Sequence, residues 1–160
     1  VFQDKVKIKY SISYEKHKSW GGTLKYWGDP QTQASYSYHM VRTDFLRLAE
    51  AMMKDYQKQT CVGKYLKQAR LQALTWPKYR PFINKSKLWL HNYAKKYGAQ
   101  FYVDFYGMDD RNVFGTEGYN GQNMLIDMDN SRIIVTNSAA TGWDQTIYMI
   151  NPIRDGVLPK

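Results

Sequence analysis

The chain has 160 residues, enough for a single hydrophobic core, and its 43% apolar and 23% charged residues are typical of a globular domain. No apolar run approaches the roughly 18 residues of a membrane-spanning helix. The single cysteine, Cys61, excludes a disulfide within the chain and leaves the cellular compartment open. The net charge of +9 admits an anionic partner, but the basic residues are scattered, which favours solvated faces and argues against nucleic acid.

The chain starts at Val1 without a methionine or a signal-like apolar segment, which indicates a processed or excised polypeptide. Apolar and polar side chains then alternate strictly over 5–14, so this stretch is predicted to be a strand with one face in water. Gly21-Gly22 and Trp27-Gly28-Asp29-Pro30 mark turns after it. The region 1–34 is therefore expected to hold one strand and loops.

The region 35–98 is predicted to be helical. Its first helix begins at Thr43, whose side chain suits an N-cap, with Asp44 in the first turn. Apolar residues follow at helical spacings of three and four: Phe45, Leu48, Ala49, Met52, Met53 and Tyr56.

Two further helices are predicted in the same region. One covers about 63–74 and is ended by Trp76-Pro77. The other starts near Ser86 and stops at Gly98. It places five apolar residues on one side: Trp89, Leu90, Tyr93, Ala94 and Tyr97.

The region 99–160 changes to a period of two and is predicted to hold three antiparallel strands and a terminal helix. The strands are expected at 100–106, around 124–126 and at 132–136, with polar turns at 107–112 and 127–131. A short helix over 143–150 is expected to be closed by Asn151-Pro152. The whole chain is predicted to be one α+β domain or domain fragment, with helices packed on an antiparallel sheet.

Three glycines precede the apolar run at 124–126. Gly115, Gly118 and Gly121 recur every third residue, and glycine lets the backbone approach another group closely or take a positive φ. We expect the strand to open on a glycine-lined edge that faces a pocket and aligns a substrate. Glu117 is the carboxylate whose position on this edge invites a functional interpretation, against the alternative of a solvent-facing residue at a strand end.

Metal and cofactor chemistry is not predicted. His17, His39 and His91 lie far apart in the sequence and only one cysteine accompanies them, so no zinc site is expected. His91 is interpreted as a packed or surface residue rather than a catalytic one. The acid pairs Asp109/Asp110 and Asp127/Asp129 fall in turns, where aspartate bonds the local backbone, and are interpreted as structural.

Two segments carry a resemblance to a known family. The first reads Phe-Gly-Thr-Glu-Gly-Tyr-Asn-Gly-Gln from Phe114 and leads into Leu125-Ile126-Asp127 and Ile133-Ile134-Val135. It resembles the C-terminal strands of the serine β-lactamase and penicillin-binding protein superfamily, and looks closest to the branch of class C β-lactamases, esterases and 6-aminohexanoate-dimer hydrolases. The second, from Tyr38 to Met53, resembles the Thr/Ser-x-x-Asp-x-x-Arg helix that precedes those strands in the family.

The resemblance implies a fold, an activity and a set of site residues. The fold is the C-terminal portion of the β-lactamase-like fold, and the activity is acyl transfer from an ester or amide through an acyl-enzyme. The family's Lys-Thr-Gly or His-x-Gly triplet, which begins the strand at the edge of the active site, corresponds to Thr116-Glu117-Gly118, with Gly121 as the later glycine. These four residues are therefore the expected substrate-binding residues.

The chain departs from the family in its catalytic motifs. Tyr-x-Asn and Ser-x-Asn do not occur, and the one Ser-x-x-Lys, at Ser13, lies in an extended polar context. No catalytic residue is therefore predicted within the chain, and the isolated chain is expected to be inactive. Glu117 would repel an anionic acyl donor, which favours a neutral or cationic ester or amide as substrate.

Two expectations about partners follow. As part of a serine hydrolase, the chain is expected to pair with a missing N-terminal segment or with a second copy of itself. The alternative hypothesis is a non-catalytic binding module for a glycan, a peptide or a polyanion, which the 14 tyrosines and the scattered lysines motivate.

Overall fold

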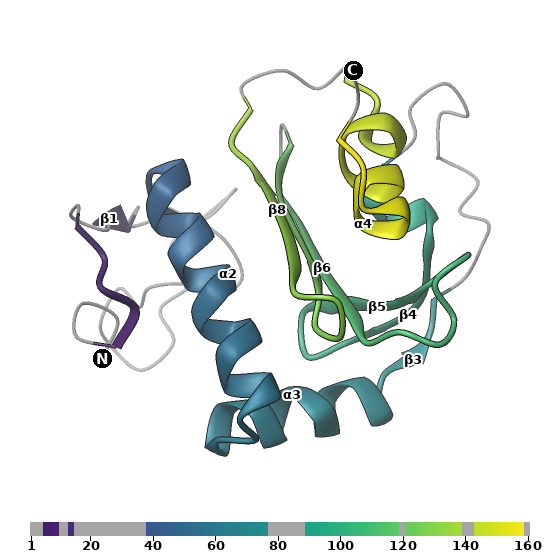
Figure 1. Ribbon diagram of the computed structural model, residues 1–160, viewed down its shortest axis with the longest axis horizontal. Helices are drawn as coiled ribbons and strands as arrows, with labels where there is room; N and C mark the ends of the chain where they lie inside the picture. Colours follow the sequence, from purple (N-terminus) through teal and green to yellow (C-terminus); the bar gives the residue numbers. More distant parts are fainter. Residues whose placement is uncertain are drawn as a thin grey trace, which may run out of the picture.

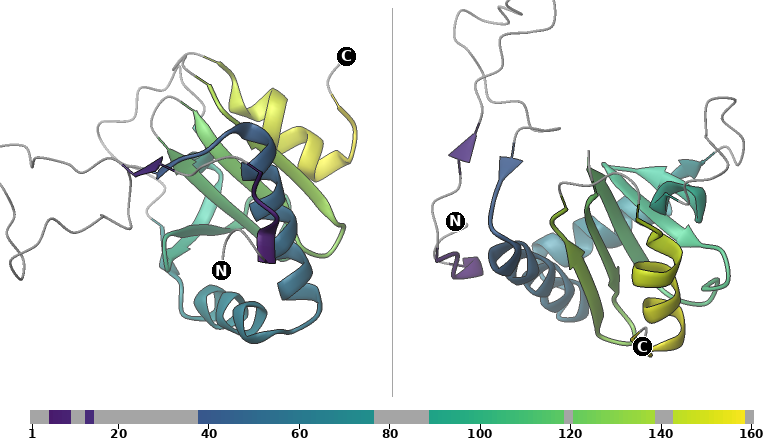
Figure 2. Two further views of the ribbon diagram at one scale, coloured as in Figure 1. Left: turned by 90° about the vertical axis from the view of Figure 1, so that its left-hand side faces the viewer. Right: turned by 90° about the horizontal axis from the view of Figure 1, so that it is seen from above.

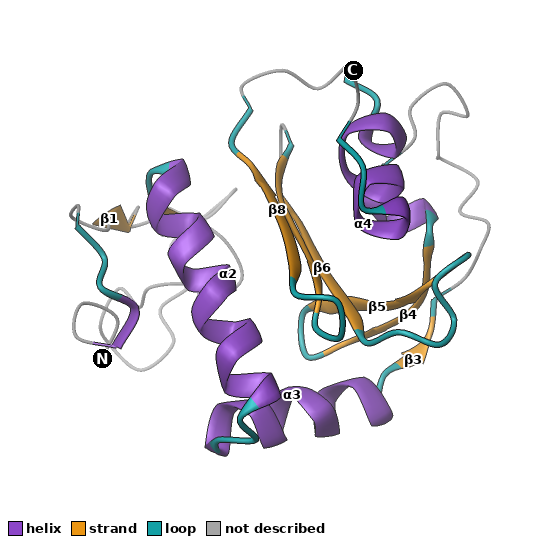
Figure 3. Cartoon of the chain, viewed as in Figure 1, coloured by secondary structure: helices purple, strands orange, loops and turns teal. Residues whose placement is uncertain are grey.

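The computed structural model describes residues 5–9, 13–14, 38–76, 89–118, 121–138 and 143–158. These residues form a six-stranded antiparallel sheet with helices on both faces, which confirms the predicted α+β class (Figure 1). Two helices, α2 (Arg42–Gln57) and α3 (Cys61–Leu71), cover one face, and the C-terminal helix covers the other (Figures 2 and 3).

The sheet is a meander in which each strand pairs with the next one in the chain. Its strands are β3 (Leu74–Thr75), β4 (Ala94–Gly98), β5 (Phe101–Phe105), β6 (Val113–Gly118), β7 (Gln122–Asp127) and β8 (Arg132–Thr136). A separate pair joins β1 (Ser13–Tyr14) to β2 (Tyr38–His39). The three strands predicted from the sequence correspond to β5, β7 and β8.

The core has two layers because successive side chains of a strand point to opposite faces of the sheet. In β6, Val113 packs under the C-terminal helix, whereas Phe114 packs under α2 and α3. In β7, Leu125 and Ile126 divide between the two layers in the same way. All four side chains are at most 1% exposed, so the β6–β7 hairpin is the centre of the fold.

The helix α2 (Arg42–Gln57) confirms the first predicted helix but not its predicted cap. The helix begins before Thr43, and Val41 is the N-cap residue without a side-chain hydrogen bond. Asp44 does lie in the first turn, but its side chain is buried. Its carboxylate contacts the guanidinium of Arg47 and accepts a hydrogen bond from the backbone N–H of Lys9. This inward-facing aspartate therefore joins the start of α2 to the segment 5–9.

The second predicted helix is shorter than expected at its C-terminal end. The helix α3 (Cys61–Leu71) is capped by Thr60, whose hydroxyl accepts a hydrogen bond from the Gly63 N–H at 3.4 Å. The predicted residues up to 74 do not continue the helix, because Leu74 pairs with Tyr97 of the sheet. Gly63 lets α3 approach α2, since a Cβ there would lie 2.0 Å from the Asp55 carbonyl oxygen.

The third predicted helix, over 86–97, is wrong where the structure describes it. Leu90–Asn92 is a single 3-10 turn, η1, and the following residues form β4. The spacing of Trp89, Tyr93 and Tyr97 fits one face of a helix. The backbone hydrogen-bonding groups of β4 nevertheless pair with those of β5. Ala99 and Gln100 both have positive φ and close the tight β4–β5 turn.

The predicted strand over 5–14 is also wrong in its first half. Lys5 and Val6 form a helical turn, and 7–9 have no regular structure. Ser13–Tyr14 is a strand, as expected, while 10–12 lie outside the described residues. Ile8 is buried and Lys5 Nζ lies 2.7 Å from Asp55 Oδ2, so the segment 5–9 packs on α2 rather than joining a long ladder.

The glycine-rich segment differs from its prediction in one respect. It does not open the strand at 124–126 but forms a separate strand, β6, joined to β7 by a turn. The Gly121 N–H donates to the Gly118 carbonyl oxygen at 3.2 Å, and Gly121 has a φ of 84°, which favours glycine. The turn at 127–131 is confirmed, because Asp127 Oδ1 accepts the backbone N–H groups of Asp129 and Asn130.

The terminal helix is confirmed in place but extends further than predicted. A π-helical turn, η2 (Thr146–Ile150), runs directly into α4 (Asn151–Asp155). Pro152 does not close the helix but lies in the first turn of α4, which continues to Asp155. Gly156, with a φ of 75°, ends it.

Candidate functional site

The candidate site is built on the end of β6, where Gly115 makes room for a neighbouring element. A Cβ at Gly115 would lie 2.9 Å from Phe105 Cζ and 3.1 Å from Leu90 Cδ2, so only glycine lets η1 pack this closely on the strand. The Leu90 N–H donates to Gln145 Oε1 at 2.8 Å, and Gln145 is itself buried. The notch at Gly115 therefore binds the protein's own side chains and fixes the position of η1.

Fixing η1 brings His91 against Glu117, a pairing that sequence reasoning did not predict. His91 Nδ1 lies 2.7 Å from Glu117 Oε2, and the His91 backbone N–H donates to the same oxygen at 3.0 Å. With a carboxylate as its partner, Nδ1 is the donor, which leaves Nε2 as the nitrogen able to exchange a proton. The sequence interpretation of His91 as a packed residue therefore missed its role as the partner of Glu117.

The other oxygen of Glu117 has no partner among the residues that the structure describes. The Glu117 side chain is only 6% exposed, and its Oε1 is buried without a hydrogen bond to any of them. An unsatisfied buried acceptor costs about 1–3 kcal/mol, and more when it is charged. Buried polar groups left in this state are uncommon in folded proteins and call for a functional or structural reason. Glu117 is thus not the solvent-facing residue of the alternative interpretation.

An aromatic wall surrounds His91. Its ring stacks on Trp89 at 6.1 Å between centroids and lies 6.1 Å from Tyr102. Trp76 meets His91 edge-on at 6.5 Å and also contacts Tyr97 and Tyr102 at 5.1 and 5.3 Å. Tyr97 and Tyr102 face each other across the β4–β5 ladder, so the sheet itself builds this wall. Its members come from separate predicted helices and strands, which is why the sequence did not group them.

The remaining expected substrate-binding residues lie around the same hairpin. Thr116 is on the opposite face of β6 from Glu117, because side chains alternate along a strand. The Gly118 N–H donates to the buried Asn123 Oδ1 at 3.3 Å. Gly121 is covered, since a Cβ there would lie 2.5 Å from Trp143 Nε1. Glu117 therefore presents its side chain to η1, outside the hairpin, whereas the Gly118 N–H bonds within it.

A depression of about 390 Å³ lies beside the covered Gly121. Trp143, which covers the glycine, also forms part of the depression. The other lining residues come from the start of α2, the end of β8 and η2: Arg42, Val135, Thr136, Asn137, Ser138 and Tyr148. None of the three glycines is among the described lining residues, and the Trp143 indole separates the depression from the hairpin turn.

Metal ligation has no candidate in the part of the chain that the structure describes, where no three histidine, cysteine or acidic side chains gather. Within the same residues, no helix is both long and apolar enough to cross a bilayer. No family model, curated protein or solved structure matches this chain. The family resemblance therefore rests on the motifs of the sequence.

Proposed function

We propose that this chain forms the sheet-side wall of an acyl-transfer site in a β-lactamase-like serine hydrolase. Thr116, Glu117 and Gly118 would line the acyl-binding edge. The nucleophilic serine and its lysine and tyrosine would come from a segment outside this sequence, since no suitable Ser-x-x-Lys or Tyr-x-Asn occurs in it.

The pairing of β6 is the observation that supports this proposal most. The β5–β6 ladder pairs Val103 with Phe114 and Tyr102 with Gly115, and goes no further. Thr116, Glu117 and Gly118 consequently pair with β7 alone among the described strands. A strand with one free side can bind an extended ligand through its main chain, while alternate side chains set the specificity. An acyl-binding edge needs this arrangement.

The charge of Glu117 limits the substrates that such a site would accept. A carboxylate repels an anionic acyl donor and attracts a cationic one. Its Oε1 has no hydrogen-bond partner in the described part of the chain, so an amide N–H or ammonium group of a substrate would satisfy it. The proposal therefore concerns neutral or cationic esters and amides.

The reaction would follow the covalent route of the family. The serine Oγ would attack the carbonyl carbon, the alcohol or amine would leave with a proton, and water would then cleave the acyl-enzyme ester. A backbone N–H near Gly118 would serve as one oxyanion donor. His91, with Nδ1 held by Glu117, would be available near this edge to exchange a proton at Nε2.

Two measurements test the proposal. The coding sequence upstream of Val1 should contain Ser-x-x-Lys at a helix start, followed by Tyr-x-Asn. The protein that includes this segment should hydrolyse a neutral nitrophenyl ester, and Ser→Ala in that motif should abolish the activity. Turnover by the present chain alone that persists after Ser13→Ala would contradict the proposal, because no other nucleophile has been assigned.

A binding module for a glycan is the second candidate, and the aromatic wall favours it. Trp76, Tyr97 and Tyr102 are half-buried, and such rings can stack on the apolar face of a sugar. Isothermal titration of the chain with neutral oligosaccharides distinguishes the candidates. Binding that is lost in Trp76→Ala, with no effect of Glu117→Gln, would favour the glycan module.

A further inference from the structure

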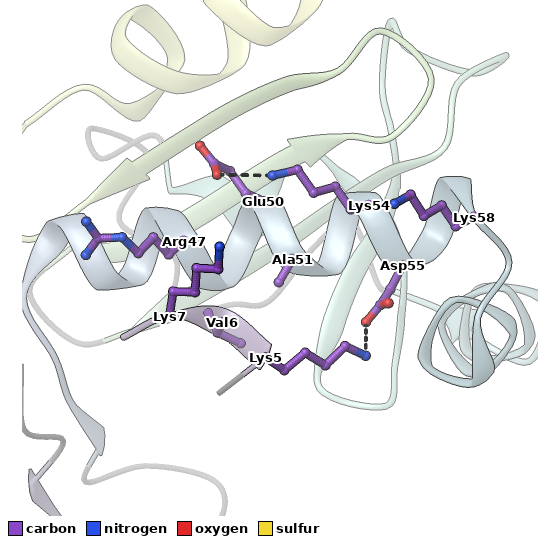
Figure 4. Close-up of a pocket in the computed structure, with 9 residues that line it drawn as sticks. All are labelled: Lys5, Val6, Lys7, Arg47, Glu50, Ala51, Lys54, Asp55 and Lys58. Atoms are coloured by element: carbon purple, nitrogen blue, oxygen red, sulfur yellow. Dashed lines mark ion pairs between the residues drawn. The ribbon is translucent and has the colours of Figure 1, made fainter. Parts of the chain in front are cut away.

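A second cleft lies on the side of α2 that faces the segment 5–9. Arg47, Glu50, Lys54 and Lys58 follow helical spacing along one side of α2, with the small side chain of Ala51 between them. Lys5, Val6 and Lys7 form the opposite wall (Figure 4). The two walls enclose a cleft of about 310 Å³.

The charges of this cleft are strongly unbalanced. Five of the nine lining residues are cationic and two are acidic. Both carboxylates are already paired, Asp55 with Lys5 at 2.7 Å and Glu50 with Lys54 at 3.6 Å. The cleft thus has no free carboxylate to offset its remaining cations.

Two of these cations form no ion pair within the part of the chain that the structure describes. The side chains of Lys7 and Lys58 form no hydrogen bond or ion pair with any residue that the structure describes, and both residues are exposed. Lys58 acts on Asp55 only through its charge. Lys7 has a φ of 55°, a left-handed backbone that costs a residue with a side chain about 1–2 kcal/mol. Figure 4 shows Lys5 and Lys7 reaching toward α2 at different levels, Lys5 toward Asp55 and Lys7 on the side of Arg47. The left-handed residue thus directs a cation into the cleft.

We propose that this cleft binds a small, multiply charged phosphate compound. Its volume lies within the range of about 300–1,000 Å³ that is usual for small-molecule sites. No aromatic side chain is among its described lining residues, so the cleft offers no ring on which a base or sugar could stack. Binding must come from charge, and lysine acts as a compact point charge toward phosphate.

The cations along α2 form a stripe, and its length indicates a ligand with more than one anionic group. Arg47 and Lys58 are 11 positions apart on α2, which corresponds to about 16 Å at a rise of about 1.5 Å per residue. A compound with two or three phosphates presents charge to more of these cations at once than a single phosphate does. This inference does not depend on the proposed hydrolase function, because it uses none of the residues of β6 or η1.

Titration with inorganic pyrophosphate and tripolyphosphate tests the inference. We expect saturable binding to the intact chain that weakens as salt rises, with tripolyphosphate tighter than pyrophosphate. Lys7→Gln combined with Lys58→Gln should weaken binding about tenfold, by roughly one decade in Kd. The matched control, Lys64→Gln with Lys67→Gln, removes the same charge from α3 and should change Kd less than about twofold.

The other outcomes would overturn the inference. If binding weakens equally in both double variants, then the affinity for the anion depends only on the net charge of the protein. Absence of binding by the intact chain would exclude the site directly. A second experiment uses vesicles of phosphatidylglycerol in phosphatidylcholine to distinguish a soluble ligand from a lipid headgroup. Vesicle binding that pyrophosphate does not displace would also refute the inference. Thermal melts of each variant check that the fold is retained.

Discussion

His91 donates both its Nδ1 proton and its backbone N–H to one carboxylate oxygen, Oε2 of Glu117, at 2.7 and 3.0 Å. The two donors hold that carboxylate at the end of β6, while its second oxygen stays buried and meets no hydrogen-bond donor of the described residues. The pair therefore combines a well-anchored group with an unsatisfied one. This combination supports the proposed role of Glu117 in binding a substrate donor.

Removing His91 should destabilise the protein more than neutralising Glu117. In His91→Ala the buried carboxylate loses its imidazole partner, which should cost about 2–3 kcal/mol. Glu117→Gln keeps an acceptor for His91 and places an amide at the unsatisfied position, so its cost should be below about 1 kcal/mol. Urea unfolding of both variants and of the double variant measures the coupling. Additive effects would show that the pair contributes nothing as a unit.

Gly115→Ala should disturb His91 without touching it. The added Cβ would press on Phe105 and Leu90, and such overpacking costs about 1–3 kcal/mol. Movement of Leu90 should carry η1 with it and shift the NMR signals of the His91 ring. Gly107→Ala is the control, because its cost arises from a φ of 75° and its Cβ would meet only Arg154 at 3.5 Å. Unchanged His91 signals in Gly115→Ala would refute the proposed dependence.

Gly121→Ala should expel the Trp143 indole from the hairpin. The new Cβ would lie 2.5 Å from Trp143 Nε1, and the φ of 84° adds backbone strain of about 1–2 kcal/mol. We expect a lower melting temperature and a red shift in the tryptophan emission. In a Trp143→Phe background the red shift should disappear. A shift that survives in this background would come from another tryptophan and would count against the prediction.

Acid should loosen the segment 5–9 from α2. The hydrogen bond and charge of Lys5 lower the pKa of Asp55 below its usual value. The folded state thus favours the ionised form, so this stabilisation is present above the unfolded pKa of about 3.9 and is lost as the pH falls through the folded pKa. Amide exchange at Ile8 and Lys9 should accelerate over that acidic range. In Asp55→Asn the exchange should already be fast near neutral pH and should lose this acidic dependence.

Local patterns in the sequence were enough to predict α2, β5, β7, β8 and the turn at Asp127. Apolar residues recur in α2 at spacings of three and four, and β8 is a run of β-branched residues. Almost any packing partner can bury such side chains. The side chain of Asp127 makes its turn by bonding N–H groups only two and three residues ahead. Such features need no knowledge of the rest of the chain.

The site could be predicted only in part. The position of Glu117 among glycines drew attention to it, but His91 lies 26 residues away in the sequence, within a segment predicted to be helical. No pattern in the sequence indicated that Trp76, Tyr97 and Tyr102 lie together, because they belong to three different strands or strand ends. Only the pairing of β3, β4 and β5 brings these rings together.

Local patterns in the chain are thus sufficient for the elements whose backbone and side-chain requirements are met within a few residues. Tertiary structure decided whether 94–98 became helix or strand, where Leu90 could dock, and what the carboxylate of Glu117 would meet. The physical reason is that a backbone hydrogen bond or a buried charge can be satisfied by distant groups as well as near ones. Which group satisfies it depends on the packing of the whole chain.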